Sequence, residues 1–191
     1  MMRRCAWLRA LAPAGFALLL AAPVAWAQGV VVAKSEIRFV SRQMGVDVEG
    51  RFRRWKANVD WRTQDLARSK VDLEIELASI DLASEEAEGE VRRAGWFDTA
   101  KFPVATFASS SIKATGADRY EIAGRLAIKG VARDVVVPVQ MRKDASGASV
   151  ATGEFVVKRL DFRIGEGQWS DPAVVANDVV VRVRMVLDAA Q

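Results

Sequence analysis

Three consecutive serines, at 109–111, are the residues of this chain that most resemble a nucleophile. A serine nucleophile needs a base beside it, and the 191 residues include no histidine. Lys113 follows Ser110 by three residues, but this pair falls at the end of an expected strand, which does not fit a Ser-x-x-Lys site. We therefore expect the serines to form a polar strand edge.

Metal and thiol chemistry are limited by the same composition. Cys5 is the only cysteine, so zinc and copper sites built on cysteine or histidine are excluded, as are Cys-His pairs. Calcium and magnesium need only oxygen ligands and stay open, although no Asp-x-Asp-x-Asp-Gly loop is present. We expect that the protein is not an enzyme and that it has no catalytic residue, no metal-binding residue and no cofactor.

Two further stretches invite a chemical interpretation. One expected strand carries three acidic residues about 7 Å apart, Asp72, Glu74 and Glu76, a spacing that a pair of glycosidase carboxylates could use. They lie on the face opposite an apolar row, so we expect them on the outer face of the sheet. The glycines of "RIGEGQWSDP" lack the lysine and the following helix of a phosphate loop. They are expected to turn a loop that presents Trp169 at the rim of an opening.

The first 27 residues read as an export signal. Three arginines precede an uncharged apolar run, and Ala25-Trp26-Ala27 offers small residues where a signal peptidase cuts. A retained membrane anchor is the alternative, because residues 10–27 approach the ~20 that a span needs. We expect residues 1–27 to be a signal peptide, residues 28–191 to form one domain, and the protein to be periplasmic.

Removal of the signal changes the charge. It leaves 25 of the 28 basic residues against 24 acidic ones, a net charge of +1 in place of +4. A basic surface for nucleic acid or anionic membranes therefore loses its basis, and we expect no nucleic-acid partner.

Alternation with period two dominates after residue 28. "KVDLEIEL" (70–77), "RYEIAGRLAIK" (119–129) and "DVVVRVRMVLD" (178–188) place apolar residues at every second position. This pattern is typical of antiparallel strands with one face in water. Five further strands are expected, which makes eight in all: 36–44, 48–61, 104–112, 135–142 and 149–159.

Two local features shape this sheet. The apolar phase slips within 48–61, which predicts a bulge or bend near Arg53 and Arg54. "SEEAEGEVRRAG" predicts one short helix, with Ser84 as N-cap and Gly95 as its left-handed C-cap. One helix covers too little of a sheet, so a closed all-β antiparallel barrel is favoured over a two-sheet sandwich. An outer-membrane barrel is the rival, but the many charges opposite the apolar rows would fill its narrow lumen.

Four ordered blocks resemble the YceI-like family of exported, lipocalin-like polyisoprenoid-binding proteins. They are "SEIRFVSRQMGVDVEGRFRRWKANVDW", "ASIDLASEEAEGEVRRAGWFDTAKFPVATFASSSI", "YEIAGRLAIKGVARDVVVPV" and "RLDFRIGEGQW". The resemblance implies an extended eight-stranded lipocalin-like barrel around a tunnel for an isoprenoid-type lipid. Many members carry two histidines where this chain has Glu90 and Met44, so any role of those histidines does not transfer.

We therefore expect a periplasmic protein that holds a quinone or polyprenyl lipid inside its barrel. The alternative is a docking partner of a membrane redox protein, with exposed tryptophans around one mouth and no transferred ligand. Transient membrane or membrane-protein contact, and a monomer or a homodimer, all stay open. The side chains expected at the ligand are Phe39, Phe52, Leu73, Phe107, Ile128 and Phe155 in the interior, with Trp96, Phe97 and Trp169 near the openings.

Overall fold

The computed structural model describes residues 29–188, which form ten strands and one α-helix. The strands are β1 (Glu36–Gln43), β2 (Val46–Phe52), β3 (Trp55–Asp60), β4 (Lys70–Glu76), β5 (Ile80–Asp81), β6 (Val104–Gly116), β7 (Arg119–Ile128), β8 (Val131–Lys143), β9 (Ser149–Lys158) and β10 (Asp178–Leu187). The helices are α1 (Glu85–Val91) and the short 3-10 segments η1 (Val32–Lys34), η2 (Leu66–Arg68), η3 (Leu77–Ser79), η4 (Arg159–Phe162) and η5 (Gly167–Trp169). The predicted signal peptide lies outside the described residues.

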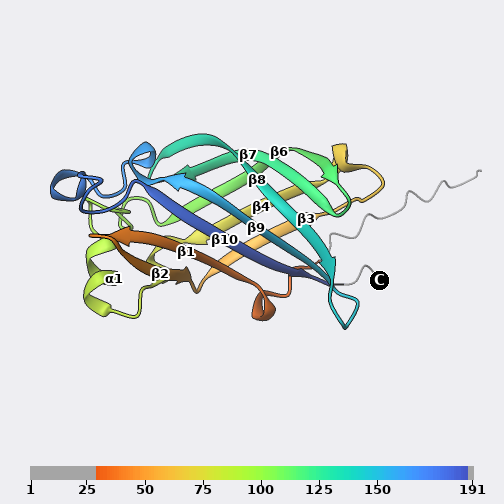
Figure 1. The fold of residues 1–191 in the computed structure, drawn as a ribbon, viewed down its shortest axis with the longest axis horizontal. Coiled ribbons are helices and arrows are strands. Elements are labelled where there is room, and N and C mark those ends of the chain that lie inside the picture. The colour runs from red at the N-terminus through yellow and green to blue at the C-terminus, as the bar shows by residue number, and fades with distance from the viewer. Residues whose placement is uncertain (1–28, 189–191) are drawn as a thin grey trace, which may run out of the picture.

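The strands form one antiparallel sheet that curls into an elongated barrel (Figure 1). Its order is β3-β4-β6-β7-β8-β9-β10-β1-β2-β5. The two ends of this order are joined by the chain itself, because β2 runs into β3 and β4 runs through η3 into β5. Around this corner the Arg53 N–H donates to the Ser79 carbonyl and the Glu76 N–H to the Arg54 carbonyl, each at 3.0 Å. The ladder therefore continues where the sheet turns back on itself.

The prediction of eight strands was wrong in number, because ten are present. The expected strand 48–61 is divided into β2 and β3 by a break at Arg53 and Arg54, where the slip in the apolar pattern predicted a bend. The additional strand, β5, has two residues, which pair with Arg51 and Phe52 of β2. The all-β antiparallel class is confirmed.

The apolar rows face the interior of the barrel. Leu77, Ile80 and Phe107 are buried, whereas Asp72 and Glu74, at alternate positions of β4, are exposed. This alternation follows from the opposite orientation of successive side chains in a strand. The interior is therefore an apolar space bounded by nearly every strand.

The single helix forms where the sequence predicts it and ends earlier. The Ser84 hydroxyl accepts a hydrogen bond from the Ala87 N–H at 3.3 Å, as expected for an N-cap. The helix ends at Val91, however, and its C-cap is Arg92 in a right-handed conformation, so the prediction that Gly95 caps it was wrong. Turns replace a last helical turn, because the Trp96 N–H already bonds to the Arg93 carbonyl at 3.0 Å.

The three serines lie within β6 at a bulge, which corrects the expected strand edge. The Ser109 hydroxyl accepts from the Val71 N–H at 2.9 Å, and the Ser110 hydroxyl donates to the Ala123 carbonyl at 3.2 Å. The bulge takes Ser110 out of the pairing with β7, and the hydroxyls of Ser109 and Ser110 bond to backbone groups of the neighbouring strands.

Candidate functional site

A cavity of about 660 Å³ occupies the interior of the barrel. One end is bounded by α1, the loop that follows it and η5, which we call the α1 end. The opposite end is bounded by side chains such as Trp61, Met141 and Met185. Its lining is mostly aliphatic and aromatic, and several of its polar residues belong to the α1 end: Ser84, Glu86, Glu90, Arg93 and Gln168.

All nine residues that the sequence placed at a ligand lie on the wall of this cavity. They are Phe39, Phe52, Leu73, Trp96, Phe97, Phe107, Ile128, Phe155 and Trp169. Three of them form a row of rings, with centroids 5.6 Å apart for Phe39 and Phe52 and 6.4 Å apart for Phe52 and Phe97. That these side chains contact a ligand stays a prediction.

Two glycines let inward phenylalanines lie against the wall. A Cβ at Gly50 would come within 2.3 Å of Phe39 Cζ, and one at Gly124 within 2.4 Å of Phe107 Cζ. Contacts below 3.0 Å do not occur for real Cβ atoms, so each ring occupies the space that a side chain would need. The rings thereby cover the backbone and leave the middle of the barrel open.

The α1 end is closed by two tryptophans. Trp96 and Trp169 pack at a centroid distance of 5.8 Å, and the Trp169 indole N–H donates to Glu90 Oε1 at 3.1 Å. The hydrogen bond joins η5 to α1 across the opening. The Trp96 indole N–H is buried and has no partner among the described residues. Trp169 is thus fixed by a polar contact, and Trp96 by packing alone.

Arg159 is a buried cation that lines the same end of the cavity and is only 2% exposed. Each of its five N–H groups donates to a backbone carbonyl at 2.7–3.1 Å; the acceptors are those of Ala176, Ile164, Gly165, Trp169 and Val175. No carboxylate of the described residues pairs with it, and burial lowers the pKa of its guanidinium. Arg159 therefore holds the segment 159–176 in place with its charge uncompensated.

A second buried cation supports the same segment from the β7–β8 turn. Lys129 Nζ donates to the Arg163 carbonyl at 2.7 Å and to Glu166 Oε2 at 3.0 Å. Hydrogen bonds from Lys129 and Arg163 lower the pKa of Glu166. The loop that carries Trp169 is thereby bound to the sheet on two sides.

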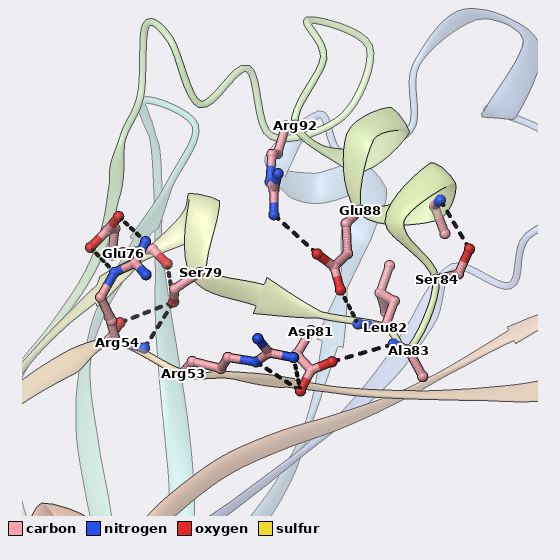
Figure 2. A network of polar contacts seen from close by, with 11 residues as sticks. Arg53, Arg54, Glu76, Ser79, Asp81, Leu82, Ala83, Ser84, Glu88 and Arg92 are labelled. Atoms are coloured by element: carbon pink, nitrogen blue, oxygen red, sulfur yellow. Dashed lines mark hydrogen bonds and ion pairs between the residues drawn. The ribbon is translucent and has the colours of Figure 1, made fainter.

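The corner between β2 and β3 is fixed by an ionic network (Figure 2). Asp81 Oδ2 accepts hydrogen bonds from Arg51 Nε at 2.8 Å and Arg53 Nε at 3.0 Å. These bonds, first from Arg53 and then from Arg51, hold the pKa of Asp81 well below its usual range. Arg54 pairs with Glu76 on the other side of the corner at 2.7 Å. Three arginines thus meet two carboxylates at the corner, and none of these five residues lines the cavity.

The same close-up shows how α1 is attached to the barrel (Figure 2). Glu88 Oε1 accepts from the Leu82 N–H at 3.2 Å, and its other oxygen pairs with Arg92 Nη2 at 3.1 Å. Together with the Ser84 cap, these contacts place the Ala87 and Val91 side chains on the cavity wall.

Sequence reasoning missed Arg159 and the inner face of α1. Arg159 continues the alternation of Phe155 and Val157, so a charged residue at an inward position was the available signal. Ala87 and Val91 stand four residues apart, the spacing of one helix face.

The arrangement is suited to holding an apolar molecule. The carboxylates that line the cavity, Glu86 and Glu90, both belong to α1, and Glu90 is bound to Trp169 and Arg93. Among the residues described, 29–188, no helix is long and apolar enough to cross a membrane.

The family model described as YceI-like domain matches residues 29–187. A UPF0312 protein from Azotobacter vinelandii is 33% identical over 142 residues, which are 72% of this chain and 73% of that protein. The match spans the sheet and the segments that surround the cavity.

Solved structures show the same fold. BcnA from Burkholderia cenocepacia superimposes with a TM-score of 0.79 at 35% identity, over 82% of this chain and 98% of BcnA. A polyisoprenoid binding domain from Saccharophagus degradans, implicated in plant cell wall breakdown, gives a TM-score of 0.69 at 19% identity, over 86% of this chain and 99% of that domain. At 19% identity the second likeness concerns the fold alone.

Proposed function

This chain belongs to the YceI-like family, and we propose that it binds and carries a long isoprenoid molecule, a quinone or a polyprenyl lipid, inside its barrel. The observation that carries the proposal is the apolar cavity of about 660 Å³, within the ~300–1,000 Å³ typical of ligand pockets. A structural neighbour of the same fold is a polyisoprenoid binding domain, which supports the isoprenoid class.

The physical basis is burial of hydrocarbon. Each methylene transferred from water contributes ~0.8 kcal/mol, so a long chain gains affinity without specific chemistry. The polar residues at the α1 end would receive the polar head of such a molecule, and the opposite end its tail. The proposed function is binding and not catalysis: among residues 29–188 the carboxylates that line the cavity are Glu86 and Glu90, and Glu90 is engaged by Trp169 and Arg93.

The proposed place of action is the periplasm. This part of the proposal rests on the signal peptide predicted for residues 1–27. The alternative function, docking to a membrane redox protein, gains no support, because Trp96 and Trp169 pack on each other instead of standing exposed.

The test is extraction of the protein purified from its own host. Native mass spectrometry and solvent extraction are expected to show one copurifying lipid with an isoprenoid fragmentation pattern. Ala57 lines the cavity, so Ala57→Phe would fill it and reduce the copurified lipid at least tenfold. Ala108 is exposed on β6, and Ala108→Phe is the matched control that should retain the lipid. Wild-type protein that is empty under these conditions would refute the proposal.

A further inference from the structure

Strands β8 and β9 pair along only part of their length. The register runs from Lys143↔Ser149 to Val139↔Gly153 and stops there. Beyond that point, residues 131–138 of β8 pair only with β7, and residues 154–158 of β9 pair only with β10. At ~3.3 Å per residue, the stretch without partners is about 17 Å long on the β9 side. We call it the β8–β9 seam; the two strands separate toward the α1 end in Figure 1.

The strands diverge beside a proline and a glycine. Pro138 has no N–H to continue the ladder, and Gly153 has no side chain; a Cβ there would lie 3.0 Å from the Pro138 carbonyl oxygen. A groove of about 540 Å³ on the outer face reaches this point. The groove and the cavity share four bordering residues, which are Arg38, Val139, Thr152 and Val183. Outer groove and inner cavity therefore meet at the start of the seam.

Apolar side chains line both faces of the seam. On the inner face, Val137, Phe155 and Val157 line the cavity and belong to one apolar cluster. On the outer face, Val136 and Val156 are 53% and 52% exposed, although their neighbours on that face include charged residues. An apolar chain in the seam would thus meet hydrocarbon on both sides.

The end of the seam is covered by a fixed segment. Phe162 and Ile164, in and after η4, are 2% and 7% exposed and belong to the same cluster. Arg159 and Lys129 bind this segment through backbone carbonyls. Buried hydrogen bonds therefore hold the segment that covers the end of the seam. The seam itself has no paired residues between β8 and β9.

We propose that the β8–β9 seam is a lateral portal through which the apolar chain of the ligand enters and leaves the cavity, an inference that rests on the proposed function. When the seam opens, only side-chain contacts between β8 and β9 are lost, because no residues of the ladder pair across it. Opening the wall elsewhere would separate paired strands. A long chain can then enter side-on, while the tryptophans and α1 stay in place.

The first experiment tests the opening without any ligand. Val137 and Leu126 both line the cavity and are both 7% exposed, but Leu126 is paired on both sides, with Phe107 and Arg133. Val137→Cys and Leu126→Cys, each in a Cys5→Ser background, are treated with a polar thiol reagent. Val137→Cys is expected to react at least tenfold faster; equal rates would overturn the portal.

The second experiment follows uptake of all-trans-retinol, a fluorescent isoprenoid. Val136→Cys/Val156→Cys, cross-linked with a short bis-maleimide, is expected to take up retinol at least tenfold more slowly than the same variant before cross-linking. Lys143→Cys/Ser149→Cys spans a matched pair of the same two strands that borders neither the cavity nor the groove, and its cross-link should change nothing.

The outcomes separate the two proposals. Unchanged uptake after cross-linking of the seam would overturn the portal and leave the binding function standing. Wild-type protein that takes up no retinol, while Val137→Cys still reacts fast, would count against the proposed function and support the seam.

Discussion

Arg159 shows how much one side chain determines at the α1 end. Its five donors satisfy five backbone carbonyls of the segment 164–176, and no other side chain could replace this set. A buried acceptor left without its partner costs ~1–3 kcal/mol, so Arg159→Met is expected to lower the free energy of unfolding by about 3 kcal/mol or more. Urea unfolding measures this loss.

The control is another arginine of the same segment. Arg163 has an exposed side chain that pairs with Glu166, and Arg163→Met should change stability by no more than about 0.5 kcal/mol. An Arg159→Met protein as stable as Arg163→Met would show that the carbonyls find other partners.

Asp81 makes a prediction about acid. Because its folded pKa is depressed by Arg53 and Arg51, its ionised form stabilises the fold at any pH above its unfolded pKa of about 3.9. That stability is lost as the pH falls from about 4 toward the folded value. Asp81→Asn should therefore unfold at lower urea than the wild type at pH 7, and the difference should shrink below pH 4.

Asp72 provides the comparison for this measurement. It is exposed on β4 and takes part in none of the ion pairs found within residues 29–188. Asp72→Asn should follow the wild-type urea midpoint across the same pH range. A gap between Asp81→Asn and wild type that stays constant down to pH 2.5 would contradict the assignment.

At the level of elements, two glycines with opposite surroundings can be compared. Gly50 faces the ring of Phe39, so Gly50→Ala must push that ring into the cavity, with a stability loss of ~1–3 kcal/mol and weaker retinol binding. Gly89 lies in α1 with nothing within 4 Å of its added Cβ, so Gly89→Ala should stabilise the protein by ~0.5–1 kcal/mol. Thermal unfolding and a retinol titration of both variants test the two predictions. A Gly50→Ala variant with wild-type stability and retinol affinity would refute the close contact between Gly50 and the Phe39 ring.

The strands were largely predictable because their side chains alternate between water and a core. The bend at Arg53 and Arg54 was predictable for the same reason. Where the alternation of apolar and polar residues shifts by one position, the strand must bend or bulge to keep its apolar side chains on the inner face. The two-residue strand β5 was not predictable, because two residues are too few to show an alternating pattern. It is a strand only because it pairs with β2. Gly95 failed as a helix cap because the following turns, fixed by tertiary contacts such as that of Glu166 with the Gly95 carbonyl, replaced the last helical turn.

The candidate site was predictable to the extent that the alternation along each strand decides which side chains point into the barrel. The nine residues line the cavity because they are large, apolar and in phase with their strands. The seam was not visible in the sequence, because pairing between strands leaves no mark within either one. Its local signs are Pro138, Gly153 and the exposed valines Val136 and Val156.

At the level of the whole molecule, charge and hydrocarbon are separated. The exterior carries the ion pairs, and the interior carries the apolar rows, with Arg159 as an exception at the α1 end. No histidine is present, and the only cysteine is Cys5, so side chains whose ordinary pKa lies between 6 and 8 are missing. Binding of a neutral isoprenoid should therefore be indifferent to pH in this range.

The prediction is a flat affinity profile. The dissociation constant for retinol, from fluorescence titration, is expected to change by less than twofold between pH 6 and pH 8, because neither the ligand nor the wall changes charge. A tenfold change between pH 6 and pH 8 would contradict the binding of a neutral ligand by an apolar interior.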